Sequence, residues 1–153
     1  MISPHVSEYM TSGPFAVGPR EPLTNARRLM SKYELRHLPV CSEGKLVGIV
    51  SDRELDLVQS VARGSVDEIT VEEAMSLDPY APSPDAPLTE VVRFMVDRRV
   101  GSAVVVDAGQ VVGIFTATDA MRALLDLFGT HAAAGAYPTK KRAPKRMRPS
   151  ARS

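Results

Sequence analysis

The order of apolar and polar residues along this chain predicts the same set of elements twice. Between residues 85 and 98, apolar side chains recur at the i, i+3, i+4, i+7 spacing of an amphipathic helix, at Leu88, Val91, Val92 and Met95. Asp85 is the expected N-cap, and Pro87 is expected in the first turn, where its missing N–H costs nothing. The matching face in the first half consists of Leu23, Ala26, Met30 and Tyr33. Both methionines are expected to fill gaps in an aliphatic core.

Two short aliphatic runs follow each of these helices and predict strands over 37–41, 46–50, 102–106 and 111–115. Each pair is joined by three residues that end in glycine, Ser42-Glu43-Gly44 and Asp107-Ala108-Gly109. Such a turn suits a hairpin whose last turn residue is left-handed. The near-continuous aliphatic run 103–106 is typical of a strand that is covered on both faces.

Further helices are predicted after Ser51 and Thr116, over 55–61 and 120–127, and short leading helices over 6–10 and 71–75. Proline-rich segments separate the leading helices from the amphipathic ones. Four prolines between residues 79 and 87 forbid a central strand there but suit an extended edge segment. The unit therefore reads β-α-β-β-α, and the expected fold class is α/β.

An internal repeat underlies this duplication. When the chain is shifted by 65 residues, positions 6–55 fall on 71–120 without a gap, and 16 of the 50 pairs are identical. The matches include Gly, Pro and Met positions, as well as the Val-Gly-Ile triplets that begin at Val47 and Val112. We therefore expect two copies of one supersecondary unit, repeat 1 over 1–64 and repeat 2 over 65–128, related by a pseudo-two-fold axis. Residues 129–153 are left as a tail.

The net charge of +1 conceals an uneven distribution. Residues 1–128 carry 12 Lys and Arg against 18 Asp and Glu, a balance of −6, whereas residues 129–153 carry +7 and no acid. The tail is basic and broken by proline, which predicts disorder. It is expected either to be solvated or to contact nucleic acid or an acidic partner through residues 139–152. Base stacking is not indicated, because only Tyr137 accompanies the charges.

The single cysteine, Cys41, excludes an internal disulfide and a C-x-x-C pair. Its aliphatic surroundings favour a buried thiol over a reactive one. No window approaches the roughly 18 consecutive apolar residues of a membrane span. The first residues lack the charged and apolar regions of a signal peptide. We therefore expect a cytoplasmic protein with no membrane association.

The motifs of the two repeats resemble the CBS domain, named for cystathionine β-synthase. In repeat 1 they read Met10-Thr11, Leu38-Pro39-Val40 and the run from Leu46 to Glu54. In repeat 2 they read Met75-Ser76, Val104-Val105-Val106-Asp107 and the run from Val111 to Asp119. The resemblance covers about residues 4–128. It implies a pair of domains with two clefts that bind AMP, ADP, ATP, S-adenosylmethionine or a dinucleotide. It also implies a sensor without catalytic activity or a required cofactor, and a homodimer of pairs.

Each repeat carries a Ser/Thr-x-x-acid element where its second strand meets its second helix. A hydroxyl at this junction lies beside free N–H groups and the positive helix end, which favour a phosphate. The acid can accept bonds from ribose hydroxyls, as acids do in other nucleotide-binding folds. In repeat 2 these residues are Thr116 and Asp119. The resemblance implies an adenine slot beside them, formed by Ser76, Asp78, Pro79, Tyr80, Gly101, Ser102 and Ala103.

The same element is also a capping box, in which hydroxyl and carboxylate satisfy each other's backbone donors. Both interpretations stay open from the sequence. In repeat 1 the acid is Glu54 after Ser51, and the extra methylene moves the carboxylate by roughly 1.5 Å. We therefore expect a weaker second site there, with Arg53 as a phosphate contact. The site's other members are His37 and Pro39, and His37 can equally be structural.

The sequence gives little support for a basic residue within the repeat 2 element, for a metal site or for catalysis. Repeat 2 has no basic residue inside its element, so Arg98 and Arg99 are the candidate phosphate contacts, with solvated surface charge as the alternative. The histidines show no metal-ligand spacing, and Cys41 has no placed base. Two hypotheses follow. One is a regulatory module that binds an adenosine-containing ligand in the cleft between the repeats. The other is a ligand-free dimerisation scaffold whose tail binds a partner.

Overall fold

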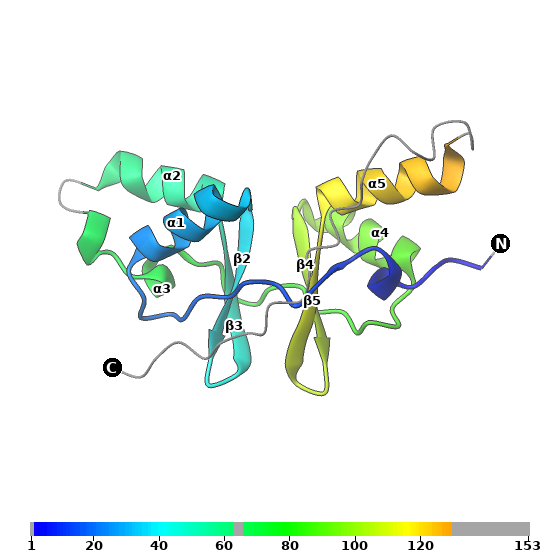
Figure 1. The fold of residues 1–153 in the computed structure, drawn as a ribbon, viewed down its shortest axis with the longest axis horizontal. Helices are drawn as coiled ribbons and strands as arrows, with labels where there is room; N and C mark the ends of the chain where they lie inside the picture. Colours follow the sequence, from blue (N-terminus) through cyan, green and yellow to red (C-terminus); the bar gives the residue numbers. More distant parts are fainter. Residues whose placement is uncertain (1, 63–65, 130–153) are drawn as a thin grey trace. The chain divides into compact units, whose positions relative to one another are not determined.

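The computed structural model describes residues 2–62 and 66–129. These residues form two compact units, each treated separately below (Figure 1). The basic tail over 130–153, and the nucleic-acid or acidic partner predicted for it, lie outside the described residues. No helix of the described chain is long and apolar enough to cross a membrane.

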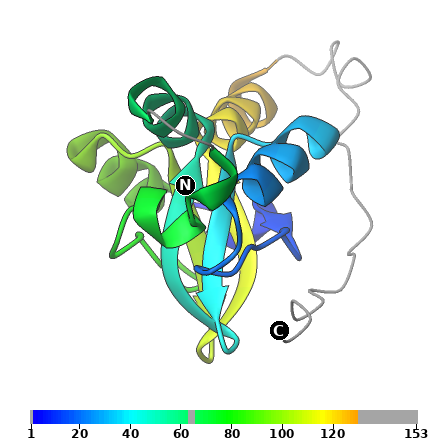
Figure 2. The same cartoon turned by 90° about the vertical axis from the view of Figure 1, so that its left-hand side faces the viewer.

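One unit, called the N-unit here, contains the main elements of repeat 1 and the leading segment of repeat 2. Its elements are α1 (Leu23–Tyr33), β2 (His37–Ser42), β3 (Lys45–Ser51), α2 (Asp52–Val61), the 3-10 turn η2 (Val66–Glu68) and α3 (Val71–Ala74). The helices α1, α2 and α3 lie on one side of the β2–β3 hairpin (Figure 1), and its turn extends beyond them (Figure 2).

The other unit, called the C-unit here, contains the main elements of repeat 2 and the leading segment of repeat 1. Its elements are the 3-10 turn η1 (Val6–Glu8), β1 (Thr11–Ser12), α4 (Leu88–Arg98), β4 (Ser102–Asp107), β5 (Gln110–Thr116) and α5 (Ala117–Phe128). The sheet order is β1-β5-β4. The predicted α/β fold class is therefore confirmed. The leading strand of the predicted β-α-β-β-α order is present as β1 in the C-unit, whereas the described residues of the N-unit include no leading strand.

The leading segments are exchanged between the sequence repeats. Val6 belongs to the core of the C-unit together with Leu88 and Phe115, and its N–H donates to the Ala86 carbonyl at 2.9 Å. Val71 likewise belongs to the core of the N-unit. The compact units thus divide the chain differently from the sequence repeats 1–64 and 65–128. The chain passes from one unit to the other before Pro14 and after Pro79.

The proline-rich segments lie along sheet edges, as their composition predicted. In the C-unit, the N–H groups of Val104 and Val106 donate to the carbonyls of Tyr80 and Pro82 at 2.8 and 3.0 Å. The segment is bound through its acceptors alone, so the missing proline N–H leaves no gap in the ladder. In the N-unit, Val17 forms a parallel bridge to Val40. Its N–H donates to the Pro39 carbonyl at 3.0 Å, and its carbonyl accepts from the Cys41 N–H at 2.9 Å.

The N-cap predicted for the repeat 2 helix is wrong. Pro87, not Asp85, is the N-cap of α4, with φ −58° and ψ 132°. The ring of a proline disfavours helical geometry in the residue before it, so Ala86 cannot join the helix and α4 begins after the proline. Asp85 is exposed and lies 3.9 Å from His5.

The predicted length of the hairpin turns is also wrong, although their left-handed glycines are confirmed. Ser42 pairs with Lys45, which leaves a two-residue turn of Glu43 and Gly44 with φ values of 51° and 79°. Ala108 and Gly109 repeat this geometry at 49° and 78°. Two consecutive left-handed residues give a turn whose twist matches that of the strands, which favours it over a longer loop.

Candidate functional site

The first feature of interest is the junction where β5 ends and α5 begins. Thr116 is the N-cap of α5, and its N–H and hydroxyl donate to Asp119 Oδ2 at 2.9 and 3.0 Å. The Thr116 hydroxyl in turn accepts from the Asp119 N–H at 3.4 Å. The capping box foreseen as one interpretation of Thr-x-x-Asp is therefore formed. It uses only one of the two carboxylate oxygens.

Arg122 binds the other oxygen. Its Nη1 lies 3.0 Å from Asp119 Oδ1, and the Asp119 side chain is 7% exposed while that of Arg122 is 62% exposed. The ion pair thus joins a buried carboxylate to a guanidinium that is open to solvent. Arg122 was not among the residues predicted from the sequence, where Arg98 and Arg99 were the candidate phosphate contacts. The signal was available, because residues three apart on a helix lie on the same face.

The equivalent junction in the N-unit has a different second partner. Ser51 N–H and hydroxyl donate to Glu54 Oε2 at 2.7 and 3.1 Å, and the hydroxyl accepts from the Glu54 N–H at 3.3 Å. The remaining oxygen of Glu54 accepts a hydrogen bond from the hydroxyl of Ser76. The longer Glu side chain therefore still forms the cap, and it also reaches the exchanged leading segment.

We call Thr116, Asp119 and Arg122 the Asp119 site, and Ser51, Glu54 and Ser76 the Glu54 site. In each, the start of the second helix is bonded to the start of the first hairpin strand. The Ala117 N–H donates to the Gly101 carbonyl at 3.1 Å, and the Asp52 N–H donates to the Arg36 carbonyl at 2.9 Å. This bond holds the strand entry beside the carboxylate.

The residues predicted for the repeat 2 site are divided between the two units. Tyr80, Gly101, Ser102 and Ala103 lie in the C-unit with Thr116 and Asp119. Ser76, Asp78 and Pro79 lie in the N-unit, so Ser76 contacts Glu54 and belongs with the Glu54 site by its local bonds. Asp78 is exposed and left-handed, with φ 53°. The leading segments carry near-equal motifs, and the sequence offered no sign of this exchange.

Tyr80 packs on the flank of α4. Its ring stacks on Phe94 with a centroid distance of 3.7 Å, and the Arg98 guanidinium lies 5.5 Å from the Phe94 centroid. Burial and the nearby charge of Glu90 raise the pKa of Tyr80. Arg98 therefore has an aromatic contact of its own, while Arg99 is the left-handed C-cap of α4 with φ 54°. Within the described part of the chain, neither of these arginines forms an ion pair with Asp119, in contrast to Arg122.

His37 and Arg53 flank the Glu54 site. His37 pairs with Ser51 across the β2–β3 ladder and is half-buried. Its pKa is lowered by burial, although Asp52 and Glu54 act in the opposite direction. A neutral imidazole is therefore expected near pH 7. Arg53 is exposed, and its N–H donates to Asp52 Oδ1 at 2.9 Å. Pro39 is buried in β2.

Other chemistry is not supported within the described residues. No group of three or more His, Cys, Asp or Glu side chains in that part of the chain could hold a metal ion. Cys41 is half-buried, and burial raises the pKa of its thiol, which disfavours the reactive thiolate.

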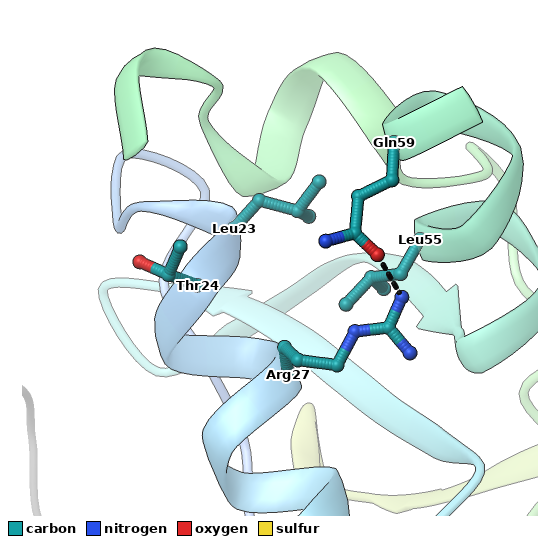
Figure 3. A pocket seen from close by; sticks show the side chains of 5 residues that line it. All are labelled: Leu23, Thr24, Arg27, Leu55 and Gln59. Atoms are coloured by element: carbon teal, nitrogen blue, oxygen red, sulfur yellow. Dashed lines mark hydrogen bonds between the residues drawn. The ribbon is translucent and has the colours of Figure 1, made fainter. Parts of the chain in front are cut away.

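A small hollow lies between α1 and α2, lined by Leu23, Thr24, Arg27, Leu55 and Gln59 (Figure 3). Its volume of about 10 Å³ holds roughly one water molecule. Arg27 closes it by donating to Gln59 at 2.7 Å and to Asp56 at 2.6 Å. The hollow is therefore too small for a nucleotide, and its arginine is already paired.

Comparison with known proteins identifies relatives along most of the chain. The CBS domain family model matches residues 6–58 and 69–126. The CBS domain-containing protein YhcV of Bacillus subtilis is 27% identical over 114 residues, which cover 74% of this chain and 81% of YhcV. The uncharacterized protein MJ1225 of Methanocaldococcus jannaschii is 31% identical over 128 residues, and the match covers 46% of its length.

Solved structures of similar fold include proteins with adenosine compounds bound. The CBS domain pair of protein MJ0100, in complex with 5′-methylthioadenosine and S-adenosyl-L-methionine, has a TM-score of 0.74 and 25% identity. The match covers 82% of this chain and 98% of that one. CBSX2 in complex with AMP has a TM-score of 0.68 and 25% identity, with 81% and 98% covered.

Proposed function

Because the chain belongs to the CBS domain family, we propose that it is a non-catalytic regulatory module that binds an adenosine-containing ligand. The candidate ligands are AMP, ADP, ATP and S-adenosylmethionine. Two neighbours of similar fold were solved with S-adenosyl-L-methionine or AMP, which supports this class of ligand. The cytoplasmic location stays a prediction.

The observation that supports the proposal is that the two oxygens of the Asp119 carboxylate have different partners. Oδ2 accepts from both donors of Thr116, whereas the one partner of Oδ1 among the described residues is Arg122, whose side chain is 62% exposed. The cap therefore fixes the carboxylate in position without consuming the second oxygen. A carboxylate held in this way can accept a ribose hydroxyl at the positive end of α5, where a phosphate is also favoured.

The proposed ligand contacts are Thr116 and Asp119, with Gly101, Ser102, Ala103 and Tyr80 nearby in the C-unit. The Glu54 site is the proposed weaker second site, with Arg53, His37 and Pro39 beside it. The second oxygen of Glu54 already accepts a hydrogen bond from the Ser76 hydroxyl. This bond and the extra length of the Glu54 side chain are two reasons to expect weak ligand binding. Ser76, Asp78 and Pro79 are proposed to act there, since they lie in the N-unit.

Thermal unfolding with AMP, ADP, ATP and S-adenosylmethionine tests the proposal. A ligand present at 100 times its dissociation constant stabilises the folded state by about 2.7 kcal/mol, which is several degrees for a body of this size. We expect Asp119→Asn to abolish this shift and the matched change Glu54→Gln to leave most of it. If no adenosyl compound moves the midpoint at millimolar concentration, the regulatory module is excluded.

The alternative is a ligand-free scaffold that dimerises and binds a partner through its tail. The division of charge favours it, since an acidic body of −6 carries a basic tail of +7. A scaffold predicts no midpoint shift with any adenosyl compound, so the unfolding experiment separates the two functions. Both functions include a homodimer, which we propose forms through the exposed apolar side chains of α5, Met121, Leu124, Leu125 and Phe128.

A further inference from the structure

The acceptor capacity of Asp119 is nearly used up by its own protein. Each carboxylate oxygen accepts about two hydrogen bonds. Oδ2 already accepts from the N–H and the hydroxyl of Thr116. Oδ1 accepts from Arg122, so one acceptor position is left. A ribose presents two neighbouring hydroxyls, and both can bond to this carboxylate only after Arg122 has moved away.

Arg122 is able to move. Its side chain is 62% exposed, and its position on α5 leaves the guanidinium in contact with solvent on one side. When Arg122 moves away, its guanidinium loses the Asp119 carboxylate as its ion-pair partner. The hydroxyls of a ribose are neutral, so they cannot replace this negative partner. A ligand that also carries a phosphate supplies a new partner, because a guanidinium binds phosphate oxygens with two parallel hydrogen bonds.

From these contacts we infer that Arg122 is a specificity-determining residue, which makes ribose binding at Asp119 depend on an anionic group of the ligand. The Asp119 site therefore selects nucleotides over the corresponding nucleosides. The ligand breaks one ion pair, Arg122 with Asp119, and forms another, Arg122 with phosphate. This inference rests on the proposed function, and it specifies the class of ligand that the C-unit accepts.

The Glu54 site has no arginine at the position equivalent to Arg122. The residue equivalent to Arg122 under the 65-residue shift is Leu57, which is 64% exposed on α2. The second oxygen of Glu54 is met instead by the neutral Ser76 hydroxyl, held by the backbone bonds between Ser76 and Ile49 at 2.8 and 3.1 Å. Ligand binding is therefore expected to depend on an anionic group of the ligand at the Asp119 site and not at the Glu54 site.

The test compares AMP with adenosine on the full chain, followed by the amide signals of Thr116 and Ser51 in NMR titrations. These two amides report separately on the Asp119 and Glu54 sites. In the unaltered protein we expect AMP to bind at Thr116 more tightly than adenosine by about tenfold or more, since the phosphate replaces the partner that Arg122 loses. Arg122→Leu, which copies Leu57, should weaken AMP and leave or strengthen adenosine, so that the preference disappears.

Two further variants keep the result interpretable. Arg122→Gln retains a donor to Asp119 without the charge, and it should also lose the preference for AMP even if the leucine variant folds poorly. Arg98→Leu removes the competing candidate for the phosphate contact, whose guanidinium lies over Phe94. If Arg122 determines the preference for AMP, this variant keeps it.

Equal weakening of AMP and adenosine, or an unchanged ratio in both Arg122 variants, would overturn the inference while leaving the regulatory module intact. AMP binding that perturbs Ser51 but not Thr116 would overturn it as well, because the ligand would then occupy the other site. If neither compound perturbs either amide at millimolar concentration, the proposed function fails, and the inference fails with it.

Discussion

At the scale of single residues, the Asp119 carboxylate has two separate sets of partners. The capping box and the ligand site were competing interpretations of Thr-x-x-Asp, yet the geometry makes them compatible, because the cap occupies Oδ2 and leaves Oδ1 to Arg122. The Asp119 carboxylate is only 7% exposed, and the cap and Arg122 together give each of its oxygens a hydrogen bond. These bonds offset the cost of burying its charge. The same division holds for Glu54, with Ser76 in place of the arginine.

The sequence identified both acids and both hydroxyls but neither second partner. Ser76 was assigned to the repeat 2 site, and its bond to Glu54 was not predicted, since a residue 22 positions away gives no local signal of contact. Arg122 was overlooked for a different reason. It lies outside the four-residue element, one turn further along α5, where residues three apart share a face of the helix.

Tyr9 provides a test at this scale that is independent of any ligand. Its hydroxyl donates to Asp126 Oδ2 at 2.6 Å, and this bond, with burial and the charge of Asp126, raises the pKa of Tyr9 to about 12. The unfolded value is about 10, so folding favours the protonated phenol. The stabilisation is therefore complete below about pH 10 and is lost as the pH rises toward 12.

We expect Tyr9→Phe to lower the unfolding free energy by about 1 kcal/mol at neutral pH, the usual worth of a partly exposed hydrogen bond to a charged group. The difference from the unaltered protein should vanish above the folded pKa. Phenolate absorbance should show a tyrosine that titrates near pH 12, which Tyr9→Phe removes and Asp126→Asn shifts down. A tyrosine spectrum unchanged by both variants would contradict the assigned bond.

At the scale of elements, periodicity predicted the helices and strands well. The i, i+3, i+4, i+7 spacing located α4, and the matching apolar face located α1. The aliphatic runs located all four hairpin strands to within one residue at each end. The exchange of leading segments was not predictable. Val6 and Val71 are identical residues at equivalent positions, so neither core discriminates between them by side-chain size. The choice depends on the path of the whole chain, which no local pattern contains.

Two glycines let the exchanged segments approach their sheets closely. A Cβ at Gly48 would lie 2.9 Å from the Ser76 carbonyl oxygen and 2.7 Å from the Met75 sulfur. At Gly113, the nearest atoms all belong to the flexible Met10 side chain. The backbone obstacle at Gly48 is fixed by the bonds between Ser76 and Ile49, whereas a methionine side chain can rotate.

We therefore expect Gly48→Ala to lower the unfolding free energy by about 1–3 kcal/mol, the usual cost of overpacking. Gly113→Ala should cost clearly less, because only a side chain has to move. Urea denaturation of the two variants measures the difference directly. Equal losses, or a larger loss for Gly113→Ala, would show that the backbone contact of Ser76 is not the limiting one.

At the scale of the whole molecule, the two repeats differ in the exposed side chains of their second helices. On α5, the exposed apolar side chains include Met121, Leu124, Leu125 and Phe128, which are 58–72% exposed. Three of the equivalent positions on α2 are the polar residues Asp56, Gln59 and Ser60. An apolar stripe at helical spacing packs well against a copy of itself, and a two-fold axis brings the same face of two subunits together. The repeat that carries Arg122 is therefore also the repeat proposed to form the dimer.

This assignment predicts which helix controls assembly. Leu125→Glu places a charge within the apolar stripe, so we expect it to convert a dimer into a monomer, as measured by sedimentation equilibrium at micromolar concentration. Leu57→Glu is the matched control, because Leu57 is 64% exposed on α2 and has polar neighbours. It should leave the dimer intact. A monomeric unaltered protein, or a dimer that Leu57→Glu disrupts and Leu125→Glu does not, would refute the α5 interface.

Because Leu125 lies three residues from Arg122 on the same helix, dissociation should also alter AMP binding at Thr116 if assembly and ligand are coupled.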